Sequence, residues 1–167
     1  MVAITAITAV IAAACTSTPT PYRPAAPSQL RATVVAEIPH DTSAFTEGLE
    51  LVDGVLYEGT GLEGRSAMRA VDPATGAVRQ ETSLPKELFG EGITVVGQRI
   101  WQLTYRNGVA IQRDRGTLAE LRRASYQGEG WGLCFDATAN RLIMSDGTDR
   151  LTFRDPETQR SDRKSVV

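Results

Sequence analysis

The chain has 167 residues, which is enough for one domain of ordinary size, and its hydrophobic share of 41% and charged share of 23% are typical of a globular protein. Its net charge of −2 comes from scattered residues of both signs, so we expect no nucleic-acid partner. With one histidine and two distant cysteines in the whole chain, neither a disulfide framework nor a zinc site is expected, and we predict no metal and no cofactor.

The N-terminal segment is predicted to be a targeting signal and not part of the fold. Residues 2–14 form an uncharged apolar run, too short to cross a bilayer, that ends in small residues before Cys15. This arrangement is typical of a bacterial lipoprotein, with residues 1–15 as signal peptide and Cys15 as the lipidation site. The alternative is a cleaved secretory signal in which Cys15 has no role. Either way we expect export, to the periplasm or outer surface or as a secreted protein, with a lipid anchor as the membrane contact.

A Ser/Thr/Pro-rich tract separates this signal from the folded part. It cannot bury enough apolar surface to fold, so residues 16–30 are predicted to be a disordered linker. Beyond it, the period-two alternation over Thr33–His40 predicts a strand. No window carries a sustained helical pattern, although Thr117–Arg123 is compatible with a short turn of helix. Residues 31–159 are therefore expected to form one all-β domain.

An internal repeat organises this domain. Gly48, Gly92 and Gly132 occupy equivalent positions, roughly forty residues apart, and each begins a unit of short strands separated by tight turns. The pair Asp53–Gly54 predicts a hairpin, and residues 72–76, DPATG, predict a reverse turn. Such units are typical of β-propeller blades.

Three blades do not close a ring, since an open propeller leaves sheet edges unprotected. We therefore expect residues 31–159 to be an incomplete fragment of about three blades of a longer propeller. The pattern stops at residues 160–167, RSDRKSVV, which we interpret as a non-native tail in which DRKSVV is translated from a sequencing adapter. The alternative is a natural disordered tail.

Three Gly-rich segments place polar and aromatic residues at the starts of strands. They are FTEGLELVDGVLY at 45–57, FGEGI at 89–93 and GEGWGLCF at 128–135. In the second, Glu91 lies between two glycines, which would let the backbone turn sharply and let another group approach the carboxylate. A repeat protein can build one site from such equivalent segments, and Glu91 is the candidate at its centre.

Six motifs in this order carry a resemblance to a known family: HDTSAFTEGL, LYEGTGLEGRSAMR, VDPATG, LFGEGITVVGQRIWQLTY, GEGWGLCFD and IMSDGTDRLTFRDP. From residue 35 to residue 158 the chain resembles the plant and bacterial type of glutaminyl-peptide cyclotransferase. The resemblance implies a five-bladed propeller that works without metal, unlike the zinc-dependent animal type. It also implies an acyltransferase that converts an N-terminal glutamine of peptide or protein substrates to pyroglutamate with release of ammonia. We expect a monomer.

The resemblance assigns roles to residues whose motif positions match. Glu91 matches the catalytic acid/base glutamate, and Trp131 and Phe89 match pocket residues. Tyr105 stands where the family has Trp, whereas Phe45 and Glu47 match a segment in which Glu47 replaces Gln. The family also uses an Asn, a Trp and a Lys from later blades, so the 167-residue chain by itself is expected to be inactive and poorly folded.

The chemistry supports this assignment independently of the name. The α-amine attacks the side-chain carbonyl of its own residue, so the enzyme has mainly to hold a productive conformer and move protons. One carboxylate can do both transfers if a partly dry pocket raises its pKa towards neutrality. The alternative is a non-catalytic exported propeller lipoprotein that binds a partner with the same face. A lactonase-like or dehydrogenase-like propeller would need side chains that bind a metal or a quinone, and the presence of only one histidine in the sequence argues against such a site.

Three other polar residues are given structural roles. His40 is expected to form a structural hydrogen bond before the first strand, and Asp146 to form a turn. Cys134, within a strand, is expected to be a small buried apolar residue.

Overall fold

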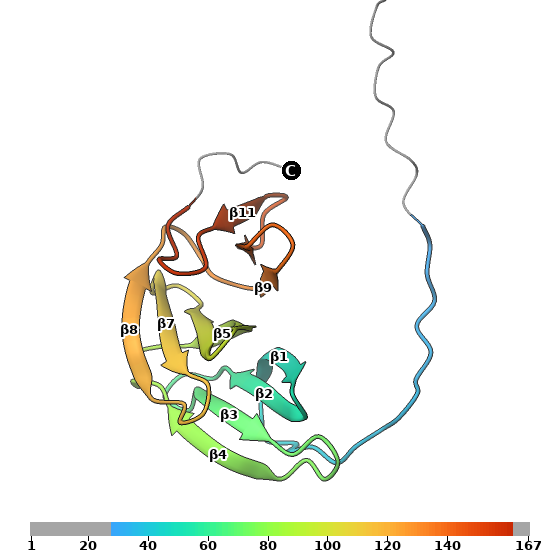
Figure 1. Cartoon of the computed structure of the whole chain (residues 1–167). Coiled ribbons are helices and arrows are strands. Elements are labelled where there is room, and N and C mark those ends of the chain that lie inside the picture. The colour runs from blue at the N-terminus through green and yellow to red at the C-terminus, as the bar shows by residue number, and fades with distance from the viewer. Residues whose placement is uncertain (1–27, 162–167) are drawn as a thin grey trace, which may run out of the picture. The chain divides into compact units, whose positions relative to one another are not determined.

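The structure is a computed structural model that describes residues 28–161, and every regular element in that range is a β-strand (Figure 1). The predicted signal peptide, Cys15 and most of the predicted linker lie outside the described residues, as do residues 162–167 of the predicted tail. The chain divides into two units, residues 1–35 and 36–167, and the second contains all the strands. In the described range there is no helix able to span a membrane.

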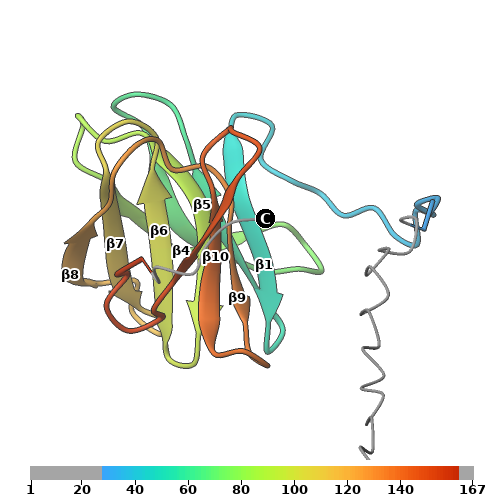
Figure 2. The same ribbon diagram turned by 90° about the horizontal axis from the view of Figure 1, so that it is seen from above.

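Eleven strands form three antiparallel sheets. The first sheet contains β1 (Thr46–Val52), β2 (Val55–Thr60), β3 (Ala67–Val71) and β4 (Val78–Ser83). The second contains β5 (Gly90–Val96), β6 (Arg99–Thr104), β7 (Val109–Asp114) and β8 (Glu120–Ser125), which lie side by side in Figure 2. The third contains β9 (Leu133–Asp136), β10 (Arg141–Ser145) and β11 (Leu151–Arg154). Each sheet is a meander in sequence order, so the predicted all-β repeat is confirmed, one sheet for each predicted unit.

The predicted strand over Thr33–His40 is wrong. Residues 28–45 form no strand, and Val34 and Val35 are exposed. Alternation alone does not make a strand, because an extended segment also needs a neighbouring strand to pair its backbone groups. His40, at the end of this segment, is confirmed as a structural hydrogen-bonder. Its Nε2 lies 2.8 Å from Oε1 of the buried Glu58.

The same turn follows the third strand of each sheet. Asp72, Asp114 and Asp155 each accept, through Oδ1, the backbone N–H groups two and three positions later. This turn explains why the helical turn suggested for Thr117–Arg123 does not form. Asp114 captures both the N–H and the hydroxyl of Thr117, and the chain then enters β8.

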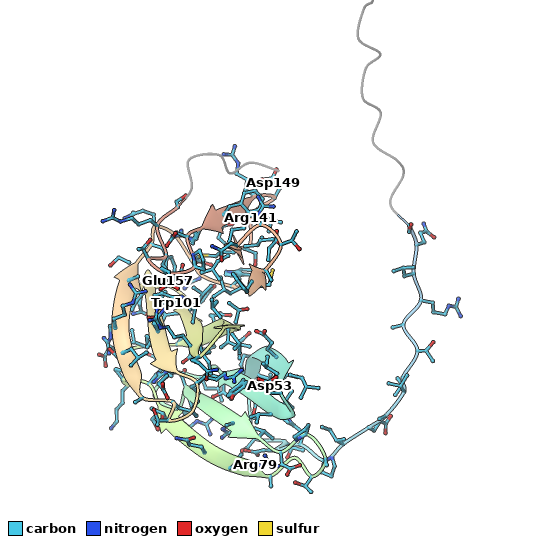
Figure 3. All side chains as sticks on the ribbon, viewed as in Figure 1. Asp53, Arg79, Trp101, Arg141, Asp149 and Glu157 are labelled. Atoms are coloured by element: carbon cyan, nitrogen blue, oxygen red, sulfur yellow. The ribbon has the colours of Figure 1, made fainter. Side chains whose placement is uncertain are left out.

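Two apolar clusters join the sheets. One contains residues of the first two sheets, including Met68, Ile93 and Ile100, and the other contains Trp101, Leu142 and residues near them from the second and third sheets. The indole Nε1 of Trp101 donates to the carbonyl of Pro156 at 2.8 Å, close to Glu157 (Figure 3). These clusters hold neighbouring sheets face to face. Cys134 is not part of either cluster and is exposed, so its predicted burial is wrong. In β9 the alternate residues, Leu133 and Phe135, make the core contacts.

The first strands of the sheets pack closely, β1 against β5 and β5 against β9. At Gly92 the backbone N–H donates to the carbonyl of Trp131 at 2.8 Å, and a Cβ added there would lie 2.3 Å from that oxygen. At Gly48 an added Cβ would lie 2.6 Å from the backbone nitrogen of Ile93. Neither Gly90 nor Gly92 has a positive φ. The sharp turn predicted around Glu91 is therefore absent, whereas the close approach is real and involves backbone.

We expect Gly92→Ala to destabilise the fold by more than about 2 kcal/mol, because the clash is with main chain that cannot rotate away. The control is Gly116→Ala, where an added Cβ meets nothing closer than 3.5 Å and φ is not positive. That change should stay within about 0.5 kcal/mol. Urea unfolding followed by circular dichroism gives both values, and equal effects would show that the strand spacing at Gly92 is not a constraint.

Candidate active site

A pocket of about 710 Å³ lies where the first strands begin. The residues that line it are Phe45, Glu47, Glu63, Glu87, Phe89, Glu91, Tyr105, Arg106, Asn107 and Trp131. All six residues predicted for the catalytic and substrate-binding site are in this set, although they come from segments spread over more than half of the chain. The structure therefore brings the whole predicted constellation to one place.

Both predicted carboxylates lie at irregular points of the innermost strands. The register between β1 and β2 shifts between Thr46 and Gly48, and that between β5 and β6 shifts between Gly90 and Ile93. Each shift leaves a glutamate, Glu47 or Glu91, outside the regular ladder. Irregularities of this β-bulge type change the direction of a side chain, and they are common beside active sites.

Glu91 and Glu47 form a coupled pair of carboxyl groups. Glu91 is 9% exposed, and its pKa is raised to about 7, first by burial, then by the charge of Glu47 and a hydrogen bond with it, and then by the charge of Glu129. Burial also raises the pKa of Glu47. Two carboxyls that share a hydrogen bond need one proton between them, so near neutral pH the pair holds a proton that it can exchange.

A row of four aromatic rings forms one side of the pocket. Ring centroids are 6.2 Å apart for Phe45 and Phe89, 5.9 Å for Phe89 and Tyr105, and 6.5 Å for Tyr105 and Trp131. Backbone hydrogen bonds join neighbouring members of the row, since the N–H of Tyr105 donates to the carbonyl of Phe89 and that of Gly130, next to Trp131, donates to the carbonyl of Tyr105. Phe45 and Trp131, at the two ends, are about half exposed. The row offers apolar surface on which a peptide can lie.

Five further residues belong to this region but were not singled out from the sequence. The lining residues among them are Glu63, Glu87, Arg106 and Asn107. Glu129 accepts hydrogen bonds from two lining residues, Arg106 and Trp131. One signal for Glu129 was present, because Gly-Glu-Gly occurs at 128–130 as well as at 90–92. Asp146 forms a turn with Thr148, as predicted, and is not among the lining residues.

The comparisons with known proteins agree with the fold and identify the family. The glutamine cyclotransferase family model matches residues 4–167. This chain belongs to the glutamine cyclotransferase family. It is 38% identical over 136 residues to the glutaminyl-peptide cyclotransferase of Arabidopsis thaliana, a match that covers 80% of this chain and 42% of the relative.

Solved structures show the same similarity. Glutaminyl cyclase from Myxococcus xanthus matches with a TM-score of 0.71 and 32% identity, over 78% of this chain and 54% of that chain. Hydrazine synthase from Kuenenia stuttgartiensis matches with a TM-score of 0.59 and 11% identity, over 79% of this chain and 38% of that one, which shows a shared fold alone. The chain thus spans about half the length of the relatives that it matches.

No group of three His, Cys, Asp or Glu side chains within residues 28–161 is arranged to hold a metal ion. The carboxyls that line the described pocket are candidates for proton transfer, and among them the pKa of Glu91 is raised to about 7.

The raised pKa of Glu91 predicts a pH-dependent contribution to stability. Between the ordinary value of 4.5 and about 7 the folded state binds the extra proton, so this contribution is lost as pH rises through that range. We expect Glu91→Gln to gain stability relative to the wild type on going from pH 5 to pH 8. Urea unfolding at both pH values measures the difference. Glu157→Gln, which changes an exposed carboxyl paired with Arg99, is the control and should show no such gain.

Proposed function

We propose that the protein is a glutaminyl-peptide cyclotransferase in which Glu91 carries protons during the cyclisation of an N-terminal glutamine. The observation that carries this proposal is the buried Glu91 in the same pocket as Glu47 and the aromatic row, with its pKa raised to about 7 by burial and by the charge of Glu47. Membership of the family supports the reaction type, and the geometry supports the role of this residue.

The reaction needs one bond formed and one broken. The neutral α-amine attacks the side-chain amide carbon of the same residue, the new C–N bond closes the ring, and the bond to the amide nitrogen breaks. Glu91, as carboxylate, accepts a proton from the attacking amine and delivers it to the leaving nitrogen, which departs as ammonia. A pKa of about 7 suits both transfers, because the group is then neither too weak a base nor too weak an acid.

The pocket also suits the charge and shape of such a substrate. An unperturbed α-amine has a pKa of about 8, so most substrate arrives as an ammonium ion, which must release one proton to solvent before the neutral amine can attack. The negative charge shared by Glu47 and Glu91 attracts that ion, and the aromatic row provides apolar surface for the chain behind it. Because the attack is intramolecular, holding one conformer of the glutamine supplies much of the rate enhancement.

We propose in addition that the reaction proceeds without a metal, since the described carboxyls can carry the proton transfers. The proposal includes a five-bladed propeller, of which residues 31–159 would be about three blades, and a monomeric, exported protein anchored through a lipid on Cys15. Loss of membrane association in Cys15→Ser would support the anchor, and unchanged association would contradict it.

The test of catalysis is ammonia release from a peptide that begins with glutamine, using the protein expressed from its complete reading frame. We expect Glu91→Gln to lower kcat by about 10²- to 10⁴-fold, the usual contribution of a general acid–base group, with a smaller change in KM. Glu157→Gln should leave both constants unchanged. Absence of turnover in folded wild-type protein would leave a binding module as the remaining function, whereas full activity in Glu91→Gln would keep the enzyme and remove the role given to this residue.

A further inference from the structure

Glu129 connects two residues that line the pocket, Arg106 and Trp131. It lies in the segment before β9, and its Oε2 accepts the indole Nε1–H of Trp131 at 3.0 Å. Its Oε1 accepts Nε–H of Arg106 at 3.1 Å, from the loop after β6. One carboxylate thus holds groups that belong to the second and the third sheets.

Arg106 extends this contact to Tyr105. Its Nη2 donates to the Tyr105 hydroxyl at 2.9 Å, and its guanidinium carbon lies 4.5 Å from the centre of the Tyr105 ring. The ring of Tyr105 in turn lies 6.5 Å from that of Trp131. The contacts therefore form a closed circuit, Glu129–Arg106–Tyr105–Trp131, which favours this arrangement of the two rings while Glu129 is charged.

We propose that Glu129 is a positioning residue of this pocket, which fixes the Tyr105–Trp131 wall through both carboxylate oxygens and places a second negative charge near Glu91. The inference rests on the proposed function only for its effect on activity, since the geometric part concerns the folded protein itself. Glu129 contacts neither reacting atom in this scheme. It acts through the rings and through its charge.

The charges around the circuit support this role. Hydrogen bonds from Trp131 and Arg106 lower the pKa of Glu129, so it is ionised at neutral pH. Its charge contributes to the raised pKa of Glu91. The titratable or charged groups that line the pocket or act on the two glutamates are Glu47, Glu63, Glu87, Tyr105, Arg106 and Tyr126. The charge of Glu47 raises the pKa of Glu91 more strongly than the charge of Glu129 does.

Two substitutions separate the hydrogen bond from the charge. Glu129→Gln removes the charge but keeps an oxygen that can accept the Trp131 indole N–H, whereas Glu129→Ala removes both. Glu120→Gln is the matched control, because Glu120 also forms an exposed pair with an arginine, Arg123, away from the pocket.

The readout is the indole ¹⁵N–¹H spectrum of the folded protein. The sequence contains two tryptophans, and Trp101, whose indole N–H is buried on Pro156, is an internal reference. In Glu129→Ala we expect the Trp131 signal to move upfield as it loses its acceptor and the Trp101 signal to stay. In Glu129→Gln the Trp131 signal should move less. Glu120→Gln should move neither signal.

The charge is tested by the titration of Glu91, followed through its ¹³C carboxyl signal. We expect both Glu129 variants to shift the midpoint to lower pH, by the same amount, and Glu120→Gln not to shift it. Where the protein turns over substrate, the acidic limb of kcat/KM should move the same way, with KM raised more in Glu129→Ala than in Glu129→Gln. An unmoved Trp131 signal in Glu129→Ala, or an unmoved Glu91 midpoint in both variants, overturns the proposal. Absence of turnover alone would instead count against the proposed function, since both spectroscopic readouts remain.

Discussion

The spacing of the first strands at two glycines is the constraint on which this structure depends. Gly48 lies against the backbone of Ile93, and Gly92 lies against the carbonyl of Trp131, with no room for a Cβ at either position. Because β5 lies between β1 and β9 at this spacing, residues at the starts of all three strands reach a common pocket. A wider separation would leave Glu47, Glu91 and Trp131 on three separate surfaces.

Burial of the Glu47–Glu91 pair lowers the stability of the fold and raises the pKa of Glu91 for the same physical reason. Taking Glu91 out of water disfavours its charged form, and the neighbouring charge of Glu47 disfavours it again. The fold tolerates this because strand pairing and two apolar clusters hold the backbone in place on both sides. The pair is thus locally unfavourable, and the packed residues around it keep it in place. Functional sites commonly contain such strained or pKa-shifted groups.

The sequence predicted the repeat because it follows from local patterns, whereas the residues that line the pocket were predicted through the family resemblance. Turn residues such as Asp72 and Asp114 act within a few positions of themselves, and their meaning could be inferred from neighbours alone. Glu91 was singled out by its place between two glycines, whereas its catalytic role and the pocket role of Trp131 were predicted through the resemblance to the family motifs. The structure corrected predictions that depend on partners distant in sequence. The segment Thr33–His40 alternates without a strand to pair with.

Three other differences between the sequence predictions and the structure have the same origin. Cys134 is exposed because its neighbours along β9 take the core positions, a fact that the sequence of that strand does not contain. Glu129 was missed because its importance lies in joining Arg106 to Trp131, which are 25 positions apart along the chain. The glycines beside Glu91 were predicted to allow a sharp turn and a close approach by another group. The turn is absent, and the approaching group is neighbouring backbone, whose identity cannot be inferred without the packed partner.

The two departures from the expected family motif both bear on the surroundings of Glu91. A glutamine at position 47 could donate an amide N–H to the Glu91 carboxylate and would favour its charged form, whereas Glu47 adds a like charge and favours the proton. Tyr105, in place of tryptophan, supplies a hydroxyl that accepts a hydrogen bond from Nη2 of Arg106. Nε of the same arginine donates to Glu129. In the proposed reaction an incoming ammonium would reverse this balance, because a positive charge beside the pair favours loss of the shared proton. Substrate binding would itself then generate the base that the first proton transfer requires.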